Sequence, residues 1–351
     1  MKVINVQDLK EGMILAQDII GKSDLLFLTR GTKLIDEHIQ RIQNMDIIYV
    51  YIGEQDEIKG QKSLSKFSIK IDKKLNEQYN KSLVSFKTVY EEVSLGKKLE
   101  SEIIQESVSP LIEEVMTDNN ILARLRSMEI VDDYTYKHSI NVCILSTMIG
   151  KWLNYSEDDL NKLAIAGMLH DIGKSRIPKE ILNKPGKLSI NECQIMKGHA
   201  TLGYEMLQEQ DEISFDICCG ALQHHERMDG KGYPLGVKGE KIHEFARIIA
   251  VADIFDAMTS ERVYKNKESP FKVAELIAQD RFGALDPYIT NQFLWNISKF
   301  YVGNIVKLNT GDIGEIVLIN KQMPTRPLVK IGNEFIDLNK HPQYEILEVM
   351  G

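Results

Sequence analysis

Cysteine is scarce in this chain of 351 residues, and its arrangement excludes a disulfide framework. The four cysteines have no C-x-x-C spacing, and the two that are adjacent in sequence would rarely bridge. Disulfides persist mainly in oxidising compartments. We therefore expect reduced thiols without a chemical role and a cytoplasmic location. The cysteines are Cys143, Cys193, Cys218 and Cys219.

Long hydrophobic runs are absent as well. The apolar run Ile47–Ile52 has the length of a strand, far short of the roughly 20 residues of a membrane-spanning helix. Near the N-terminus, Asp8, Lys10 and Glu11 interrupt the apolar stretch that a signal peptide would require. The sequence thus predicts neither a membrane span nor a secretion signal.

The chain also lacks an excess of positive charge. Lysine and arginine number 43 against 51 acidic residues, giving a net charge of −8. Such a balance supplies no general attraction for a nucleic acid polymer or an acidic lipid surface. If the protein handles phosphates, it must use a local cluster of cations or metal ions.

The hydrophobic pattern changes along the chain and predicts four parts. Residues 1–57 read as a small α+β module, 58–115 as a helical linker, 116–298 as a mainly helical catalytic domain and 299–351 as a small β-rich domain. The whole chain is therefore predicted to be mainly helical. Four strands are predicted at the C-terminus: Ile305–Leu308, Gly314–Ile319, Leu328–Ile331 and Glu345–Val349.

The linker carries one apolar stripe at helical spacing. Its residues are Ile71, Leu75, Tyr79, Leu83, Phe86, Tyr90 and Val93. Two interpretations remain open: the helix packs on the next domain, or it forms the seam of a homodimer. Either arrangement would bury the stripe.

Histidine is concentrated in the helical domain. Five of the eight histidines lie between residues 138 and 225, and two doublets, His170–Asp171 and His224–His225, occur among them. Imidazole and carboxylate together are ligands for iron, manganese, zinc or nickel. Asp171 has two oxygens and could bridge two metal ions while His170 binds one, an arrangement suited to a dinuclear hydrolase.

Several motifs here resemble the HD superfamily of metal phosphohydrolases. They are HDIGK at 170–174, IPKEILNKPGKLS at 177–189, MKGH at 196–199 and ADIFDAMTSERVY at 252–264. The segment HHERMDGKGYP at 224–234 is similar to the full signature of the HD-GYP branch. The resemblance covers residues from about 120 to 298 and implies an HD-type helical bundle.

The resemblance implies a set of metal ligands. They are His138, His170, Asp171, His199, His224, His225 and Asp253. Two divalent ions per chain, iron or manganese, suit this mixed nitrogen and oxygen set, because zinc prefers four ligands. Some family members carry a glutamate that binds a third metal, but Tyr134 occupies that position here and Asp133 would point from another helix face. We therefore expect two ions.

The resemblance also implies cations and an aromatic residue for the substrate. Lys174 matches a lysine at the metal site and is expected to act in catalysis with Asp171, while Arg262 and Lys265 match positions that bind phosphate or guanine. Tyr233 lies in the GYP loop, which reads as a lid or a docking surface for a protein partner. Asp256, one turn after Asp253, is expected to hydrogen-bond to a ligand.

The expected function follows from the same resemblance. It implies a phosphodiesterase that opens cyclic di-GMP to linear pGpG, and then to GMP in a further cut, through a metal-activated hydroxide. Two alternatives stay open: hydrolysis of another cyclic dinucleotide, or a weakly active module that senses cyclic di-GMP.

Overall fold

The computed structural model describes ten stretches of the chain. They are residues 2–16, 19–20, 26–28, 32–43, 49–53, 64–98, 101–117, 134–259, 270–278 and 285–349. The chain divides into two compact units, Met1–Leu75 and Asn76–Gly351. Within the described stretches, no helix combines the length and the apolar composition needed to cross a bilayer.

The first unit is a small α+β module. Its strands β1, β5 and β2 form an antiparallel sheet in that order, and β3 pairs with β4. Eight buried apolar side chains, among them Leu15, Leu34 and Ile42, form its core against α1. The elements are β1 (Lys2–Asn5), η1 (Val6–Asp8), β2 (Ile14–Leu15), β3 (Ile19–Ile20), β4 (Leu26–Leu28), α1 (Asp36–Gln43) and β5 (Tyr49–Gly53).

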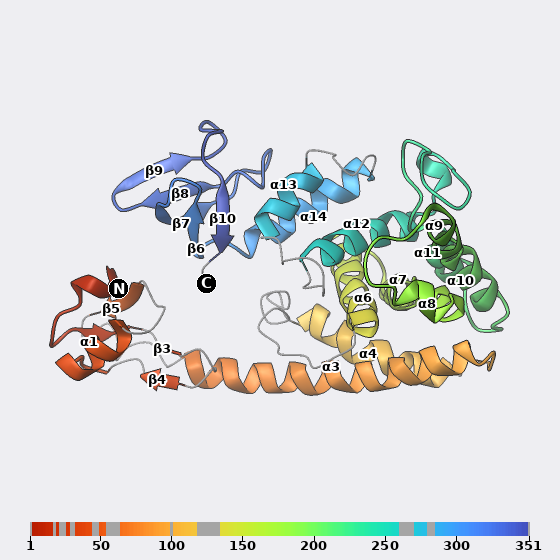
Figure 1. The fold of residues 1–351 in the computed structure, drawn as a ribbon, viewed down its shortest axis with the longest axis horizontal. Coiled ribbons are helices and arrows are strands. Elements are labelled where there is room, and N and C mark those ends of the chain that lie inside the picture. The colour runs from red at the N-terminus through yellow and green to blue at the C-terminus, as the bar shows by residue number, and fades with distance from the viewer. Residues whose placement is uncertain are drawn as a thin grey trace. The chain divides into compact units, whose positions relative to one another are not determined.

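The second unit is mainly helical (Figure 1), which confirms the predicted fold class. Its helices are α3 (Leu64–Ser94, from Asn76 onward), α4 (Ser101–Thr117), α6 (Tyr134–Trp152), α7 (Glu157–Leu169), η2 (Ile172–Arg176), α8 (Lys179–Leu182), α9 (Ile190–Lys197), α10 (His199–Gln208), α11 (Phe215–Gln223), η3 (Gly239–Lys241), α12 (Glu244–Thr259), α13 (Pro270–Ala278) and α14 (Pro287–Lys299).

Helix α7 lies at the centre of this bundle. A side-chain cap from Ser156 begins the helix, and every residue from Leu163 to Leu169 is buried. Its glycine Gly167 permits close approach to α6, because a side chain there would lie 3.1 Å from the backbone of Cys143. A helix that is apolar on all sides must be covered on all sides, so its C-terminal end and His170 are placed inside the protein.

From Tyr79 onward, the apolar stripe of the linker is buried or half-buried within the chain, while the side chains of Ile71 and Leu75 lie outside the described residues. Tyr79, Phe86 and Val93 on α3 are at most 3% exposed. The ring of Phe86 meets Tyr136 of α6 edge to face at a centroid distance of 6.1 Å. From Asn76 onward, α3 therefore packs on the helical bundle, as one of the two interpretations of the stripe predicted.

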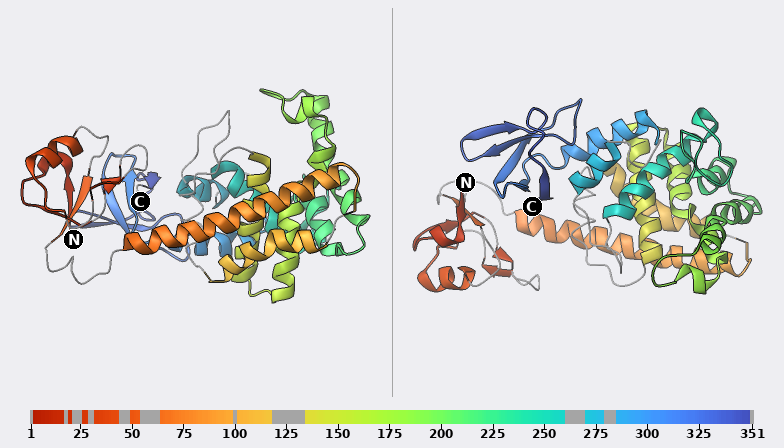
Figure 2. Two further views of the ribbon diagram at one scale, coloured as in Figure 1. Left: turned by 90° about the horizontal axis from the view of Figure 1, so that it is seen from below. Right: turned by 45° about the horizontal axis from the view of Figure 1, so that its top comes forward.

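The C-terminal part forms a five-stranded antiparallel sheet in the order β10-β6-β7-β8-β9. It lies beside α13 and α14 (Figure 2), and Phe271 of α13 shares its core. The sequence does not predict the fifth strand, β9, because its residues Glu-Phe-Ile-Asp do not alternate between polar and apolar. The strands are β6 (Ile305–Leu308), β7 (Ile313–Leu318), β8 (Leu328–Ile331), β9 (Glu334–Asp337) and β10 (Ile346–Val349).

The glycine of the HDIGK motif lies where η2 touches α10. A Cβ atom at Gly173 would lie 2.0 Å from the carbonyl oxygen of His199 and 2.5 Å from the amide nitrogen of Gly203. Because backbone atoms cannot move aside cheaply, we expect Gly173→Ala to lower the free energy of unfolding by about 3 kcal/mol or more. Urea denaturation of the metal-free protein measures this change.

Gly203→Ala is the matched control from the opposite side of the same contact. Its Cβ would lie no closer than 3.3 Å to any neighbour, and alanine favours the helix. We expect its unfolding free energy to stay within about 1 kcal/mol of the parent protein. Equal losses in the two variants would contradict the packing argument.

Candidate metal centre

Asp171 is the central residue of a buried polar cluster. It follows α7 directly, where His170 ends that helix, and it precedes η2. Its side chain is 3% exposed and has imidazole nitrogens on both sides. A carboxylate so placed can offer one oxygen to each of two neighbouring groups.

One group lies around the Oδ2 atom of Asp171. The Nε2 atoms of His170 and His138 lie 3.3 and 3.8 Å from this oxygen. Asp253 of α12 lies on the other side of His138, with its Oδ1 atom 3.1 Å from the same Nε2. The three residues His138, His170 and Asp171 lie close enough together to hold a metal ion.

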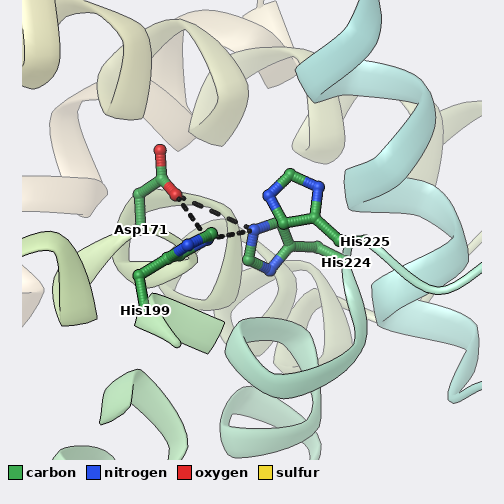
Figure 3. Close-up of side chains that lie close together, drawn as sticks. All are labelled: Asp171, His199, His224 and His225. Atoms are coloured by element: carbon green, nitrogen blue, oxygen red, sulfur yellow. Dashed lines mark hydrogen bonds and ion pairs between the residues drawn. The ribbon is translucent and has the colours of Figure 1, made fainter. Parts of the chain in front are cut away.

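The second group lies around the Oδ1 atom (Figure 3). His199 and His224 turn their Nε2 atoms toward Asp171, at 3.3 and 3.7 Å, and these two nitrogens are 3.3 Å apart. His225 lies beside them, and all four residues offer ligand atoms within 4.8 Å of one another. No helix supplies the whole set, since the residues come from α10 and from the ends of α7 and α11.

Helix ends orient three of these imidazoles. His170, His199 and His224 each have Nδ1 within 2.9 Å of the carbonyl oxygen three residues earlier. A carbonyl can only accept, so Nδ1 carries the proton and Nε2 presents its lone pair to the cluster. These carbonyls belong to the last turns of α7, α9 and α11, whose negative dipole ends favour a cation nearby.

Unpaired atoms indicate that a cation fits here. Nε2 of His170 and Oδ1 of Asp171 are buried and have no hydrogen-bond partner in the described part of the chain. The facing nitrogens of His199 and His224 would both present lone pairs. Buried polar atoms without partners are costly, and a divalent metal would satisfy all of them at once.

The protonation states suit metal binding in the second group. Burial lowers the pKa of all three histidines of this group. The pKa of His199 is lowered, that of His224 lies well below its ordinary value, and that of His225 falls to about 4. Burial alone would raise the pKa of Asp171, but the Lys174 ammonium and the adjacent His170 hold it well below its usual range. At neutral pH the group therefore consists of neutral imidazoles and a carboxylate.

His138 behaves in the opposite way. Burial disfavours its charged form, yet hydrogen bonds to Asp253 and Asp256 raise the pKa of its ring to about 10. Its Nδ1 lies 2.7 Å from Oδ2 of Asp256, as expected for that residue from the sequence. The metal-free ring thus carries a proton on Nε2 that a metal ion must displace.

The GYP loop returns to the second group and covers it. The ring of Tyr233 lies against that of His225, with centroids 4.7 Å apart. Glu226 accepts hydrogen bonds from the backbone of Leu235 and Gly236, which closes the loop. Gly232 is required at the crossing, because a Cβ there would lie 2.5 Å from the Cα of Glu226.

The structure brings all seven predicted ligands into one cluster. Lys174 lies there as well, paired with Oδ2 of Asp171. Arg262, Lys265 and Asp133 fall outside the described residues, as does the side chain of Tyr134. Sequence reasoning missed Asn141, which donates to Asp256 at 2.8 Å; its spacing of three from His138 on one helix was the available signal.

Comparison with known proteins gives consistent matches. Residues 99–289 match the family described as HD domain, and 305–350 match a KOW domain associated with HD domain. A cyclic di-GMP phosphodiesterase of Pseudomonas aeruginosa is 32% identical over 244 residues, which cover 70% of this chain and 59% of that protein. One of Thermotoga maritima is 35% identical over 253 residues, covering 70% and 66%.

A solved structure shares the fold. It is described as an HDG"Y"P protein from Bdellovibrio bacteriovorus and aligns with a TM-score of 0.52 at 17% identity, covering 83% of this chain and 97% of that one.

Fold and site together define a helical-bundle protein built around a histidine–aspartate cluster suited to metal ions. The chain belongs to the HD domain family, and its signature at 224–234 places it in the HD-GYP branch. It spans about 59 to 66% of the length of the two curated relatives.

We expect the two metal-binding groups to respond differently to pH. Below the pKa of about 10, His138 carries the proton that a cation must displace, so metal affinity of its group rises with pH. The slope should approach about tenfold per pH unit between about pH 6.5 and 8.5. His225, with a pKa of about 4, is neutral throughout this range, and the affinity of its group should change little.

Calorimetric titration of the metal-free protein with Mn²⁺ measures both slopes. Repeating it in buffers of different ionisation enthalpy counts the released protons. Identical pH slopes for the two groups would contradict the assignment.

Proposed function

We propose that this chain is a metal-dependent phosphodiesterase that opens cyclic di-GMP to linear pGpG, with GMP as the product of a further cut. The observation that carries the proposal is one buried carboxylate, Asp171, shared by two groups of inward-facing histidines. The names of the curated relatives support cyclic di-GMP as the substrate. We also propose a cytoplasmic location, which the sequence predicts from cysteines that lack disulfide spacing.

We propose two ions at this cluster, iron or manganese. Seven side chains with one shared carboxylate supply about eight bonds, and two octahedral ions offer about twelve positions, which leaves room for water and substrate oxygens. Ions held there would act as Lewis acids on the phosphodiester and lower the pKa of a bound water. The proposed ligands are His138, His170, Asp171, His199, His224, His225 and Asp253.

The residues of the chain have distinct proposed roles around this centre. The side chain of Lys174 is 26% exposed while its ammonium is paired with Asp171, so the ammonium can also reach a phosphate oxygen and offset its charge. Burial and the carboxylates of Asp171 and Asp253 raise the pKa of Tyr233, so its phenol stays protonated and can donate a hydrogen bond to the substrate. Arg262 and Lys265 are proposed to bind phosphate or guanine.

We also propose two protein contacts. Val84 is 67% exposed on α3, on the face opposite the buried stripe, and it offers a homodimer contact through the helical linker. Leu235 is 56% exposed directly after the GYP residues and offers a contact for a protein partner.

Turnover of cyclic di-GMP by protein purified anaerobically with Mn²⁺ or Fe²⁺ tests the proposed reaction. The expected result is a linear pGpG peak in anion-exchange chromatography. Faster cleavage of 3′,3′-cyclic GMP-AMP would favour the alternative substrate. Binding of cyclic di-GMP without turnover would favour a sensing module.

Replacing the shared carboxylate should remove both function and metal. We expect Asp171→Ala to lower kcat by on the order of 10³-fold or more, because ligands of both ions act as a unit. Metal content, measured by elemental analysis, should fall in parallel. Asp158→Ala removes an exposed carboxylate of α7 and is the control that should keep activity and metal. Near-normal turnover of folded Asp171→Ala would contradict the dinuclear proposal.

The number of ions is a separate prediction. A third ion would require anionic ligands of its own, and the neutral phenol at position 134 is a poor substitute, since its unperturbed pKa is near 10. We expect anomalous diffraction from Mn-loaded crystals to show two ions within the cluster. A third fully occupied ion there would contradict this prediction.

A further inference from the structure

A chain of hydrogen bonds connects the metal-binding cluster to the linker helix. The hydroxyl of Tyr79 on α3 donates to Oδ1 of Asn141 at 3.2 Å. The amide of Asn141 donates to Oδ1 of Asp256 at 2.8 Å, and Oδ2 of Asp256 lies 2.7 Å from Nδ1 of His138. Three helices, α3, α6 and α12, therefore meet in one relay that ends on a predicted ligand.

The donor and acceptor order of the relay fixes the position of the proton on the imidazole of His138. A carboxylate only accepts, so Asp256 requires a proton on Nδ1 of His138 and an amide group from Asn141. The amide oxygen of Asn141 is then left facing Tyr79, whose hydroxyl must donate. Turning the amide over would place its oxygen against the carboxylate, so the donor direction at Tyr79 is transmitted to the histidine.

Burial gives these bonds weight. Tyr79 is fully buried, Asp256 and His138 are 4% and 5% exposed, and Asn141 between them is half-buried. Water cannot readily replace a missing partner at the three buried members, so removing Asn141 leaves Tyr79 and Asp256 with unsatisfied buried groups. Burial together with the Asp256 charge also raises the pKa of Tyr79, which keeps its hydroxyl protonated.

The relay begins at Tyr79, outside the segment that matches the HD domain family. The HD domain match begins at residue 99, whereas Tyr79 precedes it on a helix that is seated on α6 through Phe86 and Tyr136. The other oriented histidines, His170, His199 and His224, use backbone carbonyls instead. Only the His138 side of the cluster is thus joined to α3 by this relay.

We propose that Tyr79 and Asn141 are positioning residues for His138, through which the seating of α3 sets the metal affinity of the group that contains His138, His170 and Asp171. The inference rests on the proposed metal centre. Anything that lifts α3 from α6 withdraws the Tyr79 hydroxyl and weakens this group, while the group of His199, His224 and His225 keeps its affinity.

Two variants of the full-length protein test the relay. Asn141→Leu removes both amide contacts at similar volume, and we expect the affinity of the His138 group for Mn²⁺ to fall by about tenfold or more. Tyr79→Phe removes a single hydroxyl, and we expect a loss of about threefold. Calorimetric titration with Mn²⁺ resolves the two groups, and the affinity of the His199 group should not change.

Ser82→Ala is the matched control. Ser82 is a second fully buried hydroxyl on α3, and its oxygen has no hydrogen-bond partner among the described residues. We expect this variant to leave both affinities unchanged. Equal weakening of both groups in Tyr79→Phe, or lower thermal stability with both affinities unchanged, would overturn the proposal and mark the relay as a general packing contact.

A spectroscopic measurement separates failure of this inference from failure of the proposed function. In metal-free protein, the Nδ1 proton of His138 should give a low-field NMR resonance that moves upfield in Asn141→Leu and, less, in Tyr79→Phe. This result depends on the relay alone. An unmoved resonance overturns the relay, even if the parent protein binds metal and hydrolyses its substrate.

Discussion

A single buried carboxylate, held among imidazoles that approach it from both sides, is the constraint on which this site depends. Asp171 has its two oxygens directed to different sets of histidines, and the Nε2 atoms of His170 and His199 that face it present lone pairs, which a carboxylate that only accepts cannot satisfy. The bundle positions this residue by burying every residue of α7 from Leu163 to Leu169, so the residues that follow the helix are inside the protein. That burial brings a carboxylate and imidazole nitrogens together in a set that could hold metal ions.

The ends of helices serve two purposes here. Terminal carbonyls have no partner within a helix, and three of them accept hydrogen bonds from the histidines that follow or end α7, α9 and α11. The same ends carry the negative pole of the helix dipole. The same backbone atoms thus orient the three histidines and provide a favourable field for a cation. No additional acidic side chain is required to orient them.

His138 and His225 are held by other means, and this difference separates the two sides of the cluster. His225 lies against Tyr233, which the GYP loop brings back over it. His138 lies in the second turn of α6, where backbone carbonyls are already engaged, so its Nδ1 uses the carboxylate of Asp256. That carboxylate is in turn connected to α3, which ties one side of the site to the helix that precedes the HD domain.

Hydrophobic periodicity in the sequence determined the mainly helical class and the terminal modules. The HDIGK and GYP motifs, through their resemblance to a known family, identified the histidines and aspartates that the structure brings together. The sequence did not predict β9, whose residues do not alternate between polar and apolar, and it left the stripe on α3 with two explanations. Only the tertiary structure placed Tyr79 and Asn141 behind His138, and showed which oxygen of Asp171 each histidine faces. Those contacts join helices far apart in sequence, and local spacing carries no information about which helices will meet.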